Sequence, residues 1–230
     1  MSKLESLEKK LDVKFKNKNL LRQAFVHRSY LNENKGFELE HNERLEFLGD
    51  ACMELVVTEY LYKNYPNPEG ELTNWRAALV RGTTISKVAQ KLDFEKYLML
   101  SKGESKSKGK AKDLILANTF EAVLGAMYLD KGYAAVDKFL KKNLISRLPE
   151  IISKELYYDP KSRFQELVQE KTGITPNYKL EKESGPDHDK VFTMAVFVDD
   201  KKIAEGKGLS KQAAEQQAAR TAIGIWEKDI

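Results

Sequence analysis

Residues 41–50 read HNERLEFLGD, and the pattern continues to residue 62 as ACMELVVTEYLY. Glu43, Glu46 and Asp50 are three and four residues apart, so an α-helix would place their carboxylates in one narrow stripe. Like charges one turn apart destabilise an isolated helix. The stretch therefore predicts a helix to about residue 65 whose acidic stripe faces either solvent or a bound cation. The opposite side, expected to face a core, carries Leu45, Leu48, Cys52, Leu55 and Val56.

Composition restricts the class of protein. A chain of 230 residues with 41% hydrophobic and 32% charged residues suits one large or two small folded domains. No run of about 18 apolar residues is present, and residues 1–15 lack an apolar signal core, so we expect no membrane partner and a cytoplasmic location. Cys52 is the only cysteine, which fits a reducing compartment. The net charge of +4 permits a nucleic-acid partner without arguing for one.

A second informative helix is expected over residues 113–130, DLILANTFEAVLGAMYLD. Its apolar residues occur nearly all round, so we expect it to be buried. Asn118 and Glu121 interrupt that apolar surface three residues apart. A buried carboxylate is costly unless it is paired or bound to a metal, so Glu121 is a better site candidate than a surface acid. The positions expected to be buried are Leu114, Ile115, Leu116, Phe120, Val123, Leu124, Met127 and Tyr128.

The rest of the first 148 residues also has helical periodicity. We expect helices at 4–14, 19–30, 72–92 and 134–147, with Gly82 a possible break in the third. Residues 66–70, PNPEG, read as a turn. Residues 101–112, SKGESKSKGKAK, hold five lysines and one acidic residue and predict a flexible loop. That loop either solubilises the surface or binds phosphates.

After a connector at 148–159 the pattern changes. Residues 161–172 predict a helix, and residues 176–183, 191–198 and 201–208 predict three short strands. The final helix is expected over 210–226, where alanines form a face small enough to lie close to a sheet. The second part of the chain therefore has the order α-β-β-β-α.

Both parts resemble one family, bacterial ribonuclease III. HNERLEFLGD closely resembles the family's signature decapeptide, and ILANTFEAVLGAMYLD resembles its second catalytic helix. PEGELTNWRAALVRG resembles the segment between them. Residues 159–230 resemble a double-stranded-RNA-binding domain, with GPDH in the loop after the first strand and SKQAAEQQAA at the start of the last helix. Two different domains thus match in the family's order over nearly the whole chain.

The resemblance implies an all-helical, dimeric endonuclease domain over residues 1–148, a linker over 149–158 and an α+β double-stranded-RNA-binding domain over 159–230. It implies hydrolysis of duplex RNA by a metal-activated water, with Mg²⁺ as cofactor and Mn²⁺ as a substitute. The products would carry 5′-phosphates, 3′-hydroxyls and two-nucleotide 3′ overhangs, in the processing of ribosomal and messenger RNA. Clustered carboxylates suit this chemistry because Mg²⁺ prefers hard oxygen ligands.

The resemblance also assigns roles to individual positions of the first domain. Those implied to hold metal are Glu46, Asp50, Asn118 and Glu121. Asp50 and Glu121 are also the expected catalytic acids, with Glu43 and Glu69 at two further acidic positions linked to selection and cleavage of the scissile bond. Phe47 matches an aromatic residue that inserts into the partner subunit of a homodimer. The helical pattern agrees, because it points Phe47 toward the acidic side, where an exposed aromatic ring favours a partner.

For the second domain the resemblance implies a grip on duplex RNA by shape, across two minor grooves and the phosphates between them. Gln165 and Glu166 would face one minor groove, and His188 in the GPDH loop would reach the next. Ser210 and Lys211, at the start of the last helix, would meet phosphates with the help of the helix N-terminus. The family often has a second lysine where this chain has Gln212, which weakens the expected phosphate contact.

Asn118 departs from the family pattern, which has an aspartate at that position. Asn offers a metal one neutral carbonyl oxygen where Asp offers a negative charge, so we expect weaker Mg²⁺ binding. Three explanations remain open: an engineered substitution that traps intact RNA, a natural enzyme with reduced metal affinity, or a natural double-stranded-RNA binder that no longer cleaves. The presence of Glu46, Asp50, Glu69 and Glu121 argues against long functional decay.

Overall fold

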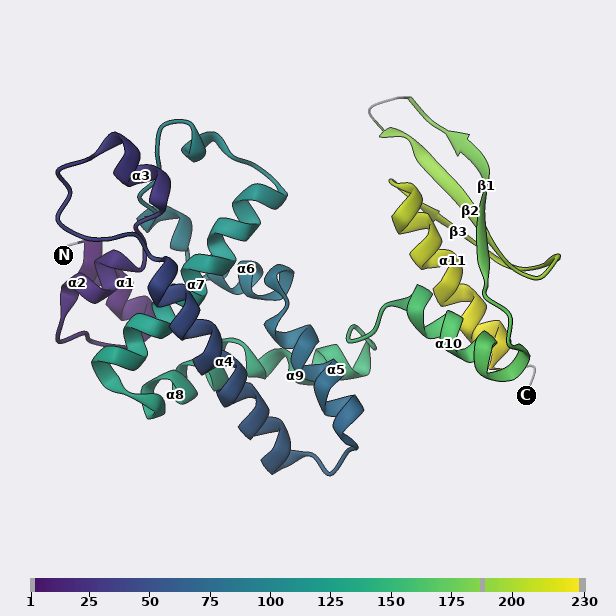
Figure 1. Ribbon diagram of the computed structural model, residues 1–230, viewed down its shortest axis with the longest axis horizontal. Coiled ribbons are helices and arrows are strands. Elements are labelled where there is room, and N and C mark those ends of the chain that lie inside the picture. Colours follow the sequence, from purple (N-terminus) through teal and green to yellow (C-terminus); the bar gives the residue numbers. More distant parts are fainter. Residues whose placement is uncertain (1–2, 187–188, 228–230) are drawn as a thin grey trace. The chain divides into compact units, whose positions relative to one another are not determined.

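The computed structural model describes residues 3–186 and 189–227, and the chain divides into two units, Met1–Tyr157 and Tyr158–Ile230 (Figure 1). The first unit is helical, and the second combines helices with one sheet. Both halves of the predicted fold class are therefore confirmed. In the described part of the chain, no helix is both long and apolar enough to cross a membrane.

The first unit is built on two long helices, α4 and α7, which make its most extensive contact. The helix predicted to run to about residue 65 is confirmed as α4, which begins at Glu43 and ends at Asn64. The bounds of the helices are α1 Lys3–Leu11, α2 Lys18–Gln23, α3 Arg28–Glu33, α4 Glu43–Asn64, α5 Glu69–Val80, α6 Gly82–Lys91, α7 Lys110–Lys131, α8 Tyr133–Asn143 and α9 Leu148–Ser153, with short 3₁₀ turns η1 Phe94–Tyr97, η2 Glu104–Lys106 and η3 Ile145–Arg147.

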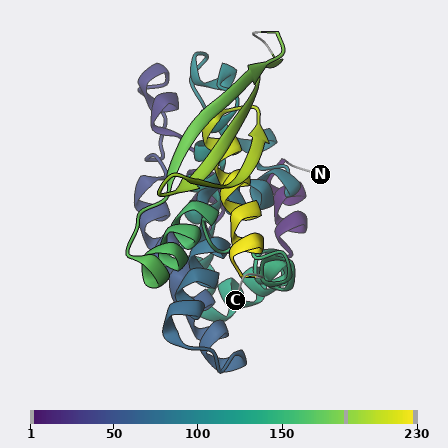
Figure 2. The same ribbon diagram turned by 90° about the vertical axis from the view of Figure 1, so that its right-hand side faces the viewer.

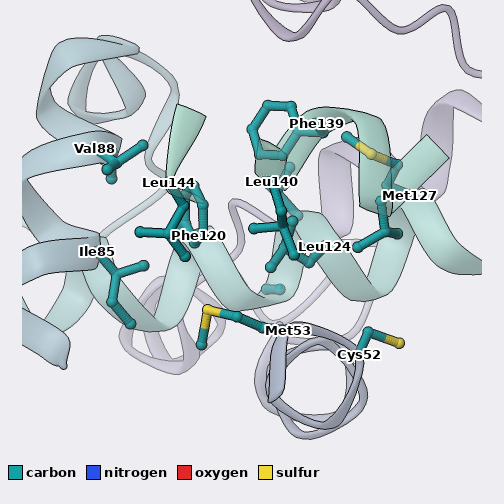
Figure 3. Packing of buried hydrophobic residues seen from close by; sticks show 14 of the residues in the cluster. Cys52, Met53, Ile85, Val88, Phe120, Leu124, Met127, Phe139, Leu140 and Leu144 are labelled. Atoms are coloured by element: carbon teal, nitrogen blue, oxygen red, sulfur yellow. The ribbon is translucent and has the colours of Figure 1, made fainter. Parts of the chain in front are cut away.

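The core of the first unit surrounds α7. Phe120 and Leu124 of this helix are fully buried between Met53 of α4 and Leu140 of α8 (Figure 3). Burying a side chain of this size contributes about 1.5–3 kcal/mol, so the middle of α7 is a major source of stability. The core fixes the position of α7, and with it the positions of Asn118 and Glu121.

Two glycines let the backbones of α4 and α7 touch where the helices cross. A Cβ atom at Gly49 would overlap the backbone carbonyl of Glu121, and one at Gly125 would overlap that of Leu45. Only glycine leaves room for this approach. The crossing therefore holds residues 46–50 of α4 against residues 118–121 of α7. Both glycines stand inside the family-like stretches, but no local pattern revealed their role at the crossing.

Replacing Gly49 by Ala should lower the free energy of unfolding of the first unit by about 3 kcal/mol, because the added methyl group overpacks a rigid backbone contact. Urea unfolding followed by circular dichroism measures this loss. Gly70→Ala is the matched control, because Gly70 lies in α5 and a Cβ atom there meets nothing within 4 Å. That control should be neutral or more stable by about 0.5–1 kcal/mol. Equal losses in both variants would contradict the close crossing.

The helix predicted over residues 19–30 is broken in the structure. The chain leaves α2 after Gln23, and Val26 forms an isolated parallel bridge with Met99. His27 then caps α3, where its Nδ1 accepts a hydrogen bond from the backbone N–H of Ser29 at 3.3 Å. A periodic apolar pattern cannot reveal such a bridge, because its partner lies far away in the sequence.

Several expected boundaries and buried positions differ as well. Leu114 and Tyr128, near the two ends of α7, are 62% and 38% exposed, because the core covers only the middle of the helix. The expected linker 149–158 contains most of α9, whose Leu148 and Ile151 are buried in the first unit. The break expected near Gly82 is present at Arg81, and the predicted loop 101–112 includes η2 and the first residues of α7.

The second unit has the predicted order α-β-β-β-α. Its elements are α10 Pro160–Thr172, β1 Asn177–Ser184, β2 Val191–Val198, β3 Lys201–Gly208 and α11 Lys211–Trp226. The strands form an antiparallel sheet in the order β1-β2-β3, and Figure 2 shows them lying over α11. Gly206 of β3 lies directly on the backbone of α11, between Ala214 and Ala218. The small-residue face predicted for the last helix thus lies on the sheet.

Candidate functional site

The crossing of α4 and α7 brings together four residues predicted to hold metal. Glu46 and Asp50 come from the first half of α4, and Asn118 and Glu121 come from α7. The Asn118 amide donates a hydrogen bond to the Glu46 carboxylate, and the charges of Glu46 and Asp50 both act on Glu121. Asn118 and Glu121, the two polar residues that interrupt the apolar surface of α7, therefore meet the acidic stripe of α4.

We define the acid cluster as Glu43, Glu46, Asp50 and Glu121, and two of its members, Glu46 and Glu121, have raised pKa values. Burial, followed by the charges of Asp50 and Glu46, raises the pKa of Glu121 from its ordinary 4.5 to about 8. Burial and then Glu43 raise the pKa of Glu46, against the opposing hydrogen bond from Asn118. A divalent cation at the same place would remove this repulsion and favour the charged carboxylates.

The donor set fits a hard divalent cation. Three carboxylates and one amide oxygen, from Glu46, Asp50, Glu121 and Asn118, match the oxygen ligands that Mg²⁺ prefers. Among the described residues, no three His, Cys, Asp or Glu side chains already form a group that could hold a metal ion. The fit therefore rests on the chemistry of the donors and on the unrelieved repulsion between them.

The two further acidic positions lie in different places. Glu43, the member of the cluster at the start of α4, lies 3.4 Å from Arg28 Nη1, and its charge acts on Glu46. Glu69 begins α5, beyond the other end of α4, and accepts a hydrogen bond from the Thr73 hydroxyl at 3.0 Å. The 18 residues from Glu46 to the end of α4 rise about 27 Å. Within one chain, Glu69 therefore does not join the other acids.

Phe47 is 81% exposed, which agrees with its predicted direction away from the core. The same broad face of α4 exposes Leu55 at 59% and Tyr62 at 80%. Leu55 was expected on the core side, and that prediction is wrong: the helix turns its side chain into solvent. A hollow of 820 Å³ lies at the corner between α4 and α5, next to Tyr62, and Glu69 is part of its wall. The sequence pattern did not reveal the exposure of Leu55 and Tyr62 or this hollow.

The predicted RNA-binding positions of the second unit are partly described. Gln165 and Glu166 are exposed on α10. Ser210 caps α11 by accepting a hydrogen bond from the backbone N–H of Ala213 at 3.1 Å. Lys211 is exposed, and its Nζ lies 3.5 Å from Glu183 Oε1. The predicted residue His188 lies outside the described residues.

Comparisons with known proteins agree with this architecture. The family model Ribonuclease-III-like matches residues 17–148, and the model Double-stranded RNA binding motif matches residues 160–224. A Ribonuclease 3 of Nitratiruptor sp. is 46% identical over 98% of this chain and 97% of its own length. A Ribonuclease 3 of Streptococcus pneumoniae is 45% identical over 92% of this chain and 91% of its own.

The first unit is similar to a solved structure of the nuclease domain of ribonuclease III from Campylobacter jejuni. That structure is described as showing structural flexibility in a region involved in dimer formation. It is 37% identical, with a TM-score of 0.57, and the match covers 64% of this chain and 99% of that one. The family match and the nearly full-length relatives leave one conclusion: this chain belongs to the ribonuclease III family.

Proposed function

We propose that this chain is an endoribonuclease that hydrolyses both strands of duplex RNA with the help of a divalent metal ion. The observation that carries the proposal is the carboxylate cluster at the α4–α7 crossing, in one chain with a double-stranded RNA binding motif. Mg²⁺ is the proposed cofactor, with Mn²⁺ as a substitute. The proposal includes a cytoplasmic location, which is based on the single cysteine.

A bound divalent cation supplies an activated water and stabilises the leaving oxygen of the phosphodiester. Glu46, Asp50 and Glu121 would hold it through carboxylate oxygens, and Asn118 through its amide oxygen. The cluster sits on helices fixed by the core, so its geometry is set before RNA arrives. The products would carry 5′-phosphates and 3′-hydroxyls with two-nucleotide 3′ overhangs, and ribosomal and messenger RNA precursors are the proposed substrates.

The lysine-rich segment 101–112 supports binding of the phosphate backbone. Lys106, Lys108 and Lys110 are exposed just before and at the start of α7, the helix that carries Asn118 and Glu121. Residues 159–230 carry 12 basic and 13 acidic side chains, so the basic excess of the chain belongs to the nuclease unit. Positive charge close to the acid cluster would attract RNA to a site that otherwise repels it.

A second candidate function is a double-stranded-RNA binder that cleaves poorly or not at all. Asn118 favours it, because the amide removes one negative charge from the proposed metal ligands. The three carboxylates of the site are all present. Burial of the Glu121 carboxylate destabilises the folded chain, and a protein that only binds RNA would gain nothing from it. We therefore rank the enzyme first.

Cleavage of a long, perfectly paired RNA, titrated with Mg²⁺ and then with Mn²⁺, tests the proposal. Gel-shift binding to the same duplex in Ca²⁺ serves as the parallel measurement. Cutting into short duplexes, even at high metal concentration only, is the expected result. Tight binding without cutting under either metal would establish the second candidate instead.

Dimerisation is the second part of the proposal. Phe47 lies eight residues before Leu55, and Tyr62 lies seven residues after it. In an antiparallel pair of α4 helices with a two-fold axis near Leu55, Phe47 of one copy therefore meets Tyr62 of the other, beside the hollow at the α4–α5 corner. The same symmetry brings Glu69 of one copy toward the acid cluster of the other, which would restore its expected role across the interface.

Phe47→Ala should weaken the homodimer by about 2 kcal/mol or more, roughly 30-fold in Kd, because it removes an aromatic anchor from the centre of the proposed interface. Light scattering over a dilution series measures the change. Leu156→Ala is the control, because Leu156 is an exposed leucine of the first unit that is not on α4. An unchanged dimer in the Phe47 variant would rule out this interface.

A further inference from the structure

A separate groove lies between α8 and the end of α1 with the residues that follow it, and we call it the α1–α8 groove. Its volume is 420 Å³, within the range of about 300–1,000 Å³ that accepts drug-sized ligands. On α7, Lys131 of this groove is ten residues beyond Glu121, about 15 Å along the helix. The groove is therefore not a part of the acid cluster. Its walls are Leu11, Asp12, Val13, Lys14, Lys131, Ala135, Lys138, Phe139 and Lys142.

Positive charge dominates the rim of the α1–α8 groove. Four of the described lining residues are lysines, and the one carboxylate among them is Asp12. Its Oδ2 lies 3.5 Å from Lys138 Nζ and 3.6 Å from Lys142 Nζ, so one acid serves two lysines. These two lysine side chains are 75% and 61% exposed and remain free to meet another carboxylate. Lys131 is also paired, because its Nζ lies 3.5 Å from Asp130 Oδ2. The described lining residues still hold three more lysines than acids.

The floor of the groove is apolar. Leu11 and Phe139 are 2% and 3% exposed and close its base, and Val13 and Ala135 are partly exposed along its sides. A phosphate backbone would meet the lysines but would gain nothing from this floor. An extended protein segment gains from both, because apolar side chains enter the groove while carboxylates meet the rim.

We propose that the α1–α8 groove binds an acidic segment of a partner protein, with an apolar side chain of that segment seated on the Leu11–Phe139 floor. In the unbound chain, the Asp12 carboxylate occupies the position beside Lys138 and Lys142 that a carboxylate of the partner would take. Asp12 therefore competes with the partner for these two lysines. This binding is independent of RNA cleavage, because none of the residues involved belongs to the acid cluster or to α4.

The probe is a short fluorescent peptide in which glutamates flank a Leu-Phe pair, and fluorescence anisotropy with the full-length chain measures its binding. Reversing both rim charges, Lys138→Glu with Lys142→Glu, should weaken peptide binding about tenfold. The matched control is Lys87→Glu with Lys91→Glu, which makes the same change of charge at the same spacing on α6, away from the groove. This control should leave the affinity unchanged.

Asp12→Asn provides a test in the opposite direction. Asp12 has a left-handed φ of 56°, a conformation that Asn also tolerates, so the variant keeps its backbone. Removing the competing charge should tighten peptide binding about threefold. Equal binding of a peptide with Ser in place of Leu-Phe would overturn the role of the floor. An equal loss of duplex RNA affinity in the Lys138/Lys142 variant would show that the groove contacts RNA instead.

Discussion

Glu121→Gln should reduce the rate of duplex RNA cleavage by about a thousandfold, because it removes one of three carboxylates that the α4–α7 crossing directs at the proposed metal. Gln keeps the size of the side chain, so the close contact between Gly49 and the Glu121 backbone survives. Affinity for duplex RNA should stay within about twofold, since most of it comes from phosphate contacts elsewhere. Single-turnover cleavage and a binding titration separate the two effects.

The thermal stability of the metal-free protein provides an independent test of the Glu121→Gln variant. The pKa of Glu121 is raised to about 8 in the folded chain, so the folded protein holds a proton that the unfolded chain has released above about pH 4.5. Stability from this group therefore falls as pH rises from about 4.5 to 8. Glu121→Gln should remove this loss and raise the Tm of the metal-free protein at pH 8, with little change at pH 4.

The control for both readings is Glu150→Gln, an exposed acid on α9 whose side chain pairs only with solvent-exposed Lys154 in the ion pairs described. It should leave cleavage unchanged and should not raise the Tm at pH 8. If Glu121→Gln cleaves as fast as the unaltered chain, the cluster at the α4–α7 crossing is not the active site.

Asn118→Asp should lower the Mg²⁺ concentration needed for half-maximal cleavage about tenfold. The substitution restores a charged ligand of nearly the same shape, and an interaction with a charged group exceeds a neutral one by roughly 1.4 kcal/mol, a factor of ten. Cleavage of one duplex across a Mg²⁺ titration measures the shift. RNA affinity should change little, because Asn118 lies beside the acid cluster, hydrogen-bonded to Glu46, and not in the lysine-rich segment 101–112.

The same variant should also lower the Tm of the metal-free protein. Its new carboxylate replaces an amide that donates to Glu46, so a hydrogen bond becomes a repulsion among acids whose pKa values are already raised. Added Mg²⁺ should then stabilise Asn118→Asp more than the unaltered chain. Asn118→Ala is the companion variant. It removes the amide oxygen, so it should raise the Mg²⁺ concentration needed for half-maximal cleavage above that of the unaltered chain. No gain in turnover from Asn118→Asp would remove Asn118 from the set of metal ligands.

Local patterns in the sequence were sufficient for much of this protein. The three- and four-residue spacing of Glu43, Glu46 and Asp50 predicted α4 and its acidic stripe, and the polar pair in an apolar run predicted the importance of Asn118 and Glu121. The α-β-β-β-α order of the second unit followed from alternation and helical periodicity. These features are local, because a residue's neighbours within one turn or one strand determine them.

Features that depend on distant contacts were not accessible in this way. The break between α2 and α3 depends on the bridge from Val26 to Met99, 73 residues later. The exposure of Leu55 depends on which face of α4 meets α7, and a stripe of apolar residues fits more than one orientation. The place of Glu69 depends on the length of α4, which separates it from the cluster in its own chain.

By itself, then, the sequence determined α4, the buried middle of α7, the α-β-β-β-α order of the second unit, the acidic stripe and the family resemblance, because periodicity and motif spacing are properties of short segments. Only the tertiary structure decided that Gly49 and Gly125 bring two helix backbones into contact and so place Asn118 and Glu121 against Glu46 and Asp50. It also decided that Lys138 and Lys142 of α8 pair with Asp12. The physical reason is that close packing joins segments far apart in the chain, and no local pattern records which segments will meet.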